Sequence, residues 1–142
     1  MVGGQAIDLA NVNRQLDLST LQTMHQLKTG ALIRAAVGLG ALAGGASAAQ
    51  RQQLDDYGRA IGLAFQVQDD ILDIESNTEV LGKTQGADQS LNKPTFPALL
   101  GMDGAKRLAR ELHDDAISAL GGFGPTAEPL RQLAAYIIER EH

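Results

Sequence analysis

The sequence contains no cysteine, which excludes disulfide cross-links, thiolate metal sites and cysteine nucleophiles. Proline is scarce, with only four residues in a chain of 142, and this scarcity favours helices over a loop-rich fold. No stretch approaches the run of about eighteen apolar residues that a membrane-spanning helix requires. The first residues also lack the basic and apolar regions of a signal peptide. These absences predict a helical protein of a reducing compartment, for which the cytoplasm is the expected location.

Positive charge is limited as well, because twelve Lys and Arg residues face seventeen Asp and Glu residues and leave a net charge of −5. The basic residues are scattered rather than gathered into a stripe, so nucleic acid is not an expected partner. A hydrophobic content of 44% with 20% charged residues is ordinary for a globular protein. A chain of this length predicts one domain rather than two.

Apolar residues recur at helical spacing through most of the chain, and no stretch alternates with a period of two for long enough to predict a strand. Ser19 is the expected N-cap of a first long helix, Gly44-Gly45 is its expected end, and Ser47 is the expected N-cap of a second. The class is therefore all-α. The predicted helices are 20–43, 47–76, 97–100, one from Asp103 up to the break at 121–125, and 128–140, with a long loop over 77–94.

The segment QVQDDILDI, residues 66–74, places three carboxylates in an otherwise apolar helix. At about 100° per residue, six residues fall within one strip roughly 120° wide: Gly58, Gly62, Gln66, Asp69, Asp70 and Asp73. The rest of the circumference is apolar, so we expect a buried helix whose polar strip faces an internal cavity floored by the glycines. Carboxylates lining a cavity suit a hard divalent cation, and Mg²⁺ is normally held by carboxylates, water and phosphate oxygens. The strip therefore predicts a magnesium site.

Two other acidic pairs serve as internal comparisons. Asp55-Asp56 has no third carboxylate nearby, and Asp114-Asp115 has Ser118 at the position where a third would stand. We assign both pairs to the solvent-exposed surface.

Lysine is rare, with four residues against eight arginines. Lys28 falls on the apolar stripe of its helix, so its ammonium group either extends to solvent or points at an anion. Lys83 and Lys93 lie in the predicted loop after the carboxylates, where they are either solvated or folded over a metal-bound phosphate. His25 lies one turn before Lys28, but a lone histidine on a long helix is more often structural or exposed than a general base, and we assign it no role.

These residues carry a resemblance to a known family. Residues 65–73, FQVQDDILD, resemble the second aspartate-rich motif, DDxxD, of the trans-prenyl diphosphate synthases, and are most similar to the bacterial farnesyl diphosphate synthases. Lys28-Thr29-Gly30 is similar to the KTG segment of that family. Leu81-Gly82-Lys83 and Asn92-Lys93-Pro94 resemble its two later lysine motifs. The four motifs occur in the family's order, and the similarity covers essentially the whole chain.

The resemblance implies an isoprenoid-synthase helical bundle that works as a homodimer with Mg²⁺. The implied reaction condenses an allylic diphosphate, dimethylallyl or geranyl, with isopentenyl diphosphate to give farnesyl diphosphate. Metals and lysines neutralise the departing diphosphate, which leaves an allylic cation for the second substrate to attack. The implied ligands of one Mg²⁺ are Asp69, Asp70 and Asp73. The implied catalytic residues are Lys28, Thr29 and Gln66. The implied diphosphate-binding residues are Lys28, Thr29, Gln66, Lys83 and Lys93. Gln5 and Asp8 resemble a further pair that lines the same cavity, with Asp8 as a second metal-ligand candidate.

The first aspartate-rich motif of the family has no counterpart in this sequence. We therefore expect residues 1–142 to form the C-terminal part of a single prenyl synthase domain, inactive alone and prone to self-association. Two alternatives remain open. In the first, the chain is a non-catalytic helical subunit or assembly module of a prenyl synthase. In the second, it is simply a helical domain whose Asp69, Asp70 and Asp73 are exposed to solvent. The product length is not predicted.

Overall fold

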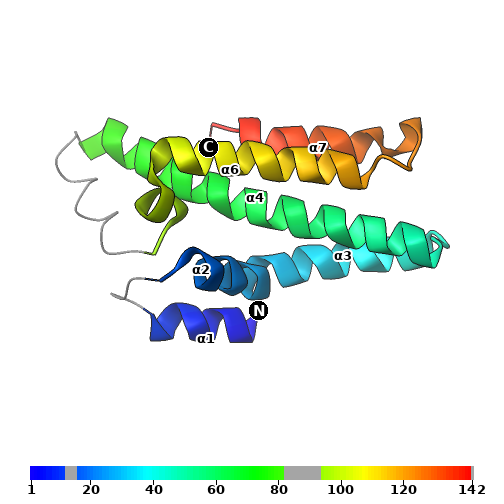
Figure 1. The fold of residues 1–142 in the computed structure, drawn as a ribbon, viewed down its shortest axis with the longest axis horizontal. Helices are drawn as coiled ribbons and strands as arrows, with labels where there is room; N and C mark the ends of the chain where they lie inside the picture. The colour runs from blue at the N-terminus through cyan, green and yellow to red at the C-terminus, as the bar shows by residue number, and fades with distance from the viewer. Residues whose placement is uncertain (12–15, 82–93, 142) are drawn as a thin grey trace.

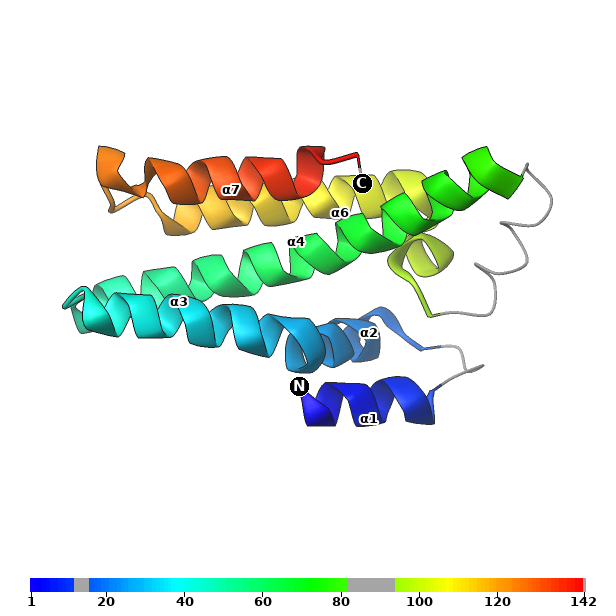
Figure 2. The same ribbon diagram turned by 180° about the vertical axis from the view of Figure 1, so that it is seen from behind.

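The computed structural model describes residues 1–11, 16–81 and 94–141, and the described part is helical without strands, which confirms the all-α class. Its elements are α1 (Val2–Ala10), α2 (Leu18–His25), a π-helical turn η1 (Gln26–Gly30), α3 (Ala31–Ala43), α4 (Ala48–Leu81), α6 (Phe96–Ala119), a 3₁₀ turn η2 (Pro125–Ala127) and α7 (Glu128–Glu139). The long helix α4 runs through the middle, with α6 and α7 on one side and α2, α3 and α1 on the other (Figure 1). The view from behind shows the same layering (Figure 2).

Helix α4 begins as the sequence predicts and ends later. The Gln50 N–H donates to Ser47 Oγ at 3.2 Å and the Ser47 N–H donates to Gln50 Oε1 at 2.9 Å, which is a reciprocal capping arrangement. The predicted end near Ser76 is wrong, because the helix continues to Leu81. Gly82 is the first helix-breaking residue after Ser76, so nothing in the intervening residues ends the helix.

The predicted single helix 20–43 is also wrong, because the π-helical turn η1 separates α2 from α3. The N-cap of α2 is Asp17, and the predicted N-cap Ser19 is wrong. The Asp17 carboxylate accepts a hydrogen bond from the Thr20 N–H at 2.7 Å. The glycine stop is confirmed, since α3 ends at Ala43 with Gly44 as its C-cap, and Gly45 has a φ of 70°. In the same way, Gly101 has a φ of 73° and kinks α6 where the sequence predicts a break between two helices.

Two groups of buried side chains pack α4 against its neighbours. The first joins α4 to α2 and α6, and the second joins it to α6 and α7. Tyr57 is fully buried in the second group, where its hydroxyl donates to the Leu130 carbonyl of α7 at 2.8 Å. Within the described part of the chain, no helix combines the length and apolar character needed to cross a membrane. The main residues of the two groups are Leu21, Met24, Leu63, Val67, Ile71 and Phe96, and Tyr57, Ile61, Ala64, Leu120 and Ile137.

Candidate functional site

The glycine half of the polar strip faces a neighbouring helix. A Cβ atom added at Gly62 would lie 3.2 Å from Gly30 Cα, and one added at Gly58 would lie 3.6 Å from Arg34 Cα. The two glycines therefore let α4 approach η1 and α3 closely, and the prediction that they floor a cavity is wrong. The helices run antiparallel, so the contact pairs Gly58 with Arg34 and, one turn later, Gly62 with Gly30.

The three aspartates of the strip have different environments. Asp69 forms an ion pair with Arg140 after the end of α7, and its side chain remains 40% exposed. Asp70 is half-buried, and its Oδ2 accepts the Phe96 N–H at 3.0 Å at the start of α6. Asp73 is exposed. Among residues 1–11, 16–81 and 94–141, no three acidic or histidine side chains converge as ready metal ligands. Joint metal binding by the three aspartates stays a prediction.

Arg140 is held by more than its ion pair. Its guanidinium also donates to the Phe65 carbonyl at 3.3 Å and lies 4.3 Å from the centre of the Phe65 ring. Its own carbonyl accepts a hydrogen bond from Gln68 Nε2 at 3.3 Å. The side chain is only 14% exposed, so Arg140 ties the end of the chain to α4 directly beside the strip.

On the other side of the strip, α1 crosses η1 at Gly4. A Cβ atom there would lie 2.3 Å from the Lys28 backbone nitrogen, so only glycine permits this approach. Lys28 Nζ lies 2.6 Å from Asp8 Oδ2, and both side chains are more than half buried. Lys28 therefore pairs with a carboxylate of the chain itself, and its binding of a diphosphate stays a prediction. Gln5 is exposed and Thr29 half-buried, whereas Lys83 and Lys93 lie outside the described residues.

His25 lies between these two sides, where sequence reasoning gave it no role. Its ring is 7% exposed and stacks on Phe96, with ring centres 5.4 Å apart. Among the described residues, neither ring nitrogen has a hydrogen-bond partner of normal geometry, although the Gln66 side chain lies close enough to act on the ring. Burial, followed by the positive charge of Lys28, lowers the pKa of His25 to about 4. The charges of Asp8 and Asp69 oppose this shift, which shows that groups from both α1 and α4 surround the ring.

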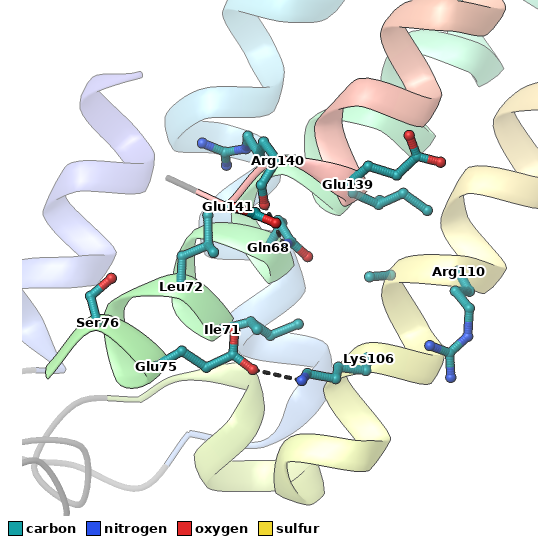
Figure 3. Close-up of a pocket in the computed structure, with 12 residues that line it drawn as sticks. Gln68, Ile71, Leu72, Glu75, Ser76, Lys106, Arg110, Glu139, Arg140 and Glu141 are labelled. Atoms are coloured by element: carbon teal, nitrogen blue, oxygen red, sulfur yellow. Dashed lines mark hydrogen bonds and ion pairs between the residues drawn. The ribbon is translucent and has the colours of Figure 1, made fainter. Parts of the chain in front are cut away.

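A cleft of about 650 Å³ opens between α4, α6 and the end of α7 (Figure 3). It lies on the side of α4 opposite the strip, since Gln68 and Glu75 point into it. Lys106 Nζ from α6 binds Glu75 Oε1 at 2.6 Å within it. This cleft is therefore not the predicted cavity, although Arg140 reaches both.

The other acidic pairs are only partly as predicted. Asp114 and Asp115 are exposed, which confirms their assignment. Asp55 is half-buried and forms a two-point pair with Arg34, at 2.8 Å for each bond, so its assignment to solvent is wrong. This hydrogen-bonded pair lowers the pKa of the Asp55 carboxyl. The Arg34 that captures it lies on the adjacent helix, which the sequence around Asp55 does not reveal.

The long central helix α4 carries an acidic strip, and η1 beside it carries Lys28. This arrangement is that of an all-α bundle of the isoprenoid-synthase class. The family model described as "Polyprenyl synthetase" matches residues 1–120. Farnesyl diphosphate synthase of Escherichia coli is 51% identical over 144 residues, covering 99% of this chain and 48% of that protein. The corresponding Haemophilus influenzae protein is 46% identical over 140 residues, covering 97% and 47%. The chain belongs to the polyprenyl synthetase family, and it spans about half the length of these relatives.

Solved structures agree with this assignment. A putative farnesyl-diphosphate synthase from Marinomonas sp. MED121 matches with a TM-score of 0.82 and 46% identity, covering 98% of this chain and 46% of that one. A geranyltransferase from Helicobacter pylori, complexed with magnesium and isoprenyl diphosphate, matches with a TM-score of 0.73 and 34% identity, covering 97% and 45%.

Proposed function

We propose that this chain supplies the second aspartate-rich half of a magnesium-dependent prenyltransferase that joins an allylic diphosphate to isopentenyl diphosphate and forms farnesyl diphosphate. The observation that carries the proposal is that His25 stacks on Phe96, whose N–H donates to Asp70 of the strip at 3.0 Å, while the charges of Lys28 and Asp69 both act on the His25 ring. A cation suited to a diphosphate and a carboxylate suited to a metal thus lie around one buried ring. The names of the relatives give the substrate class.

The residues of the strip fit Mg²⁺ by their chemistry. Mg²⁺ usually takes one or two carboxylates and completes its shell with water and phosphate oxygens, so three converging ligands are not required. Asp69 and Asp70 are candidates from adjacent positions of α4, with Asp73 one turn further. When bound, the metal supplies charge neutralisation for the departing diphosphate. Lys28 would then bind a diphosphate oxygen as a point charge, with Asp8 keeping its side chain in place.

We further propose that turnover requires more chain than these 142 residues, because only one acidic trio is present and the relatives are about twice as long. Large apolar side chains are exposed on α1 and α3, and a homodimer or a higher self-association would cover them. The cytoplasm is the proposed location. The exposed side chains are Val2, Leu9, Leu32, Leu39 and Leu42. A non-catalytic helical subunit is the competing proposal.

Calorimetric titration of the chain with dimethylallyl diphosphate, with and without Mg²⁺, separates the two proposals. We expect binding only when Mg²⁺ is present, and we expect Asp69→Ala to weaken it at least tenfold. Asp114→Ala is the matched control, since it removes an exposed aspartate away from the strip and should leave the affinity unchanged. Absence of any metal-dependent heat would favour the non-catalytic subunit.

A further inference from the structure

His25 is a buried polar side chain whose ring nitrogens lack a well-formed hydrogen bond within the described residues. More than nine-tenths of it is inaccessible to solvent, and both ring nitrogens are fully enclosed without a hydrogen bond in the described part of the chain. Buried polar atoms almost always have partners, so two unpaired nitrogens on one ring call for a specific explanation. The plane of the ring is set by its stacking on Phe96, at an interplanar angle of 27°.

The packing of α4 against η1 indicates which side chain can serve His25. Gly58 lies opposite Arg34 and Gly62 lies opposite Gly30, so each step of four residues along α4 corresponds to four residues backwards along the partner. The next step places Gln66 opposite Gln26, the residue that follows His25. Gln66 is half-buried, and its side chain interacts with the His25 ring in a way that favours the protonated form.

We propose that His25 is a positioning residue whose ring N–H donates to the side-chain oxygen of Gln66, which turns the amide NH₂ of Gln66 toward the bound diphosphate. This inference rests on the proposed function, because it assigns the diphosphate as the group that Gln66 contacts. The adjustment is small, since the terminal amide torsion of glutamine is soft and its oxygen and nitrogen exchange places by rotation.

A neutral histidine suits this task better than a charged one. A neutral ring has one donor and one acceptor nitrogen, so it can fix the oxygen of an amide and leave the two amide N–H groups free to donate to an anion. The Lys28 charge nearby and the enclosure of the ring both favour the neutral form. His25 therefore acts through Gln66 and needs no contact with the substrate.

The hydrogen bond can be tested without any ligand. The chain has three histidines, so ¹⁵N spectra of its imidazoles at pH 7 can be assigned with His113→Gln and His142→Gln. We expect His25 to be neutral with the proton on one nitrogen only, and we expect Gln66→Leu to shift the balance between the two tautomers. A mixture of tautomers in the unaltered chain, or a His25 signal unaffected by Gln66→Leu, would overturn the proposal.

The positioning role is tested by the affinity for inorganic diphosphate in the presence of Mg²⁺. His25→Phe keeps a ring on Phe96 but removes the donor, and we expect binding to weaken about two- to tenfold. In a Gln66→Leu background, the same His25→Phe change should have no further effect, whereas a merely structural role would weaken binding in both backgrounds. Equal losses in the two backgrounds, or no loss in either, refute the positioning role.

The two levels of the proposal fail differently. If the unaltered chain does not bind diphosphate with Mg²⁺, the proposed function of this chain fails, and the tautomer measurement still decides whether His25 and Gln66 are bonded. If diphosphate binds but the His25 signal ignores Gln66→Leu, the proposed function stands and the positioning role of His25 falls.

Discussion

Replacing Arg140 with methionine should have two separate effects, because its guanidinium holds both the end of the chain and the Asp69 carboxylate. Methionine keeps much of the side-chain volume and removes the charge. The losses are an ion pair with a 40% exposed aspartate, a hydrogen bond to the Phe65 carbonyl and the contact with the Phe65 ring. All three interactions are made by the same guanidinium group, so their energies do not add. We expect the free energy of unfolding to fall by about 2 kcal/mol.

The second effect concerns Mg²⁺. In the present structure Arg140 is the counter-ion of Asp69, and a metal must displace it to reach that carboxylate. An ion pair as exposed as Arg140–Asp69 contributes about 1 kcal/mol, and Mg²⁺ must overcome this energy to bind Asp69. Arg140→Met should therefore bind Mg²⁺ about fivefold more tightly, in spite of its lower stability. Urea unfolding measures the first effect, and calorimetric titration with Mg²⁺ measures the second.

Arg131→Met is the matched control for both effects. Arg131 lies on α7 away from the strip and donates to the Phe123 carbonyl at 2.8 Å, so its loss should lower stability and remove one positive charge without changing Mg²⁺ affinity. If Mg²⁺ binds Arg140→Met no more tightly than Arg131→Met, Asp69 is not a metal ligand limited by Arg140, and the reasoning is refuted.

Three further predictions concern the fold around the site. The pKa of His25 falls from 6.5 to about 4 on folding, so stability should drop by up to about 3 kcal/mol as pH falls through this range; urea unfolding should show no such drop in His25→Phe. Tyr57→Phe removes the hydrogen bond to the Leu130 carbonyl and should cost about 1 kcal/mol, and an unchanged urea midpoint would contradict this. Gly4→Ala should detach α1 and accelerate amide exchange over residues 2–10, whereas Gly40→Ala, whose added Cβ meets nothing within 4 Å, should leave that exchange unchanged.

The fold was predictable where local chemistry determines it. Ser47 and Gln50 carry the capping pattern that starts α4, and Gly101 breaks α6 where the sequence indicates two helices. The π-helical turn was not predictable, although it changes which face is buried: Leu21 and Met24 before it are buried, whereas Leu32 after it is 59% exposed. A π-helical turn holds one residue more than an α-helical turn, and no particular residue type is needed to form it.

The site was predictable in its residues and less so in its surroundings. Helical spacing places Gln66 and the aspartates on one side of α4, but it says nothing about which element covers each part of that side. The glycines turned out to meet η1 and α3. Asp69 is paired with Arg140, which is 71 residues away in the sequence, and no local pattern connects them. His25 gains its enclosed environment only from tertiary packing.

Paramagnetic broadening by Mn²⁺, used in place of Mg²⁺ together with inorganic diphosphate, tests the central claim most directly because it shows where the metal lies. The account predicts that backbone amide signals of residues 69–73 and of Lys28 and Thr29 broaden together, whereas those of the exposed pair Asp114 and Asp115 stay sharp. Broadening at Asp114 and Asp115 with none at 69–73 would contradict the assignment of the strip as the metal and diphosphate site.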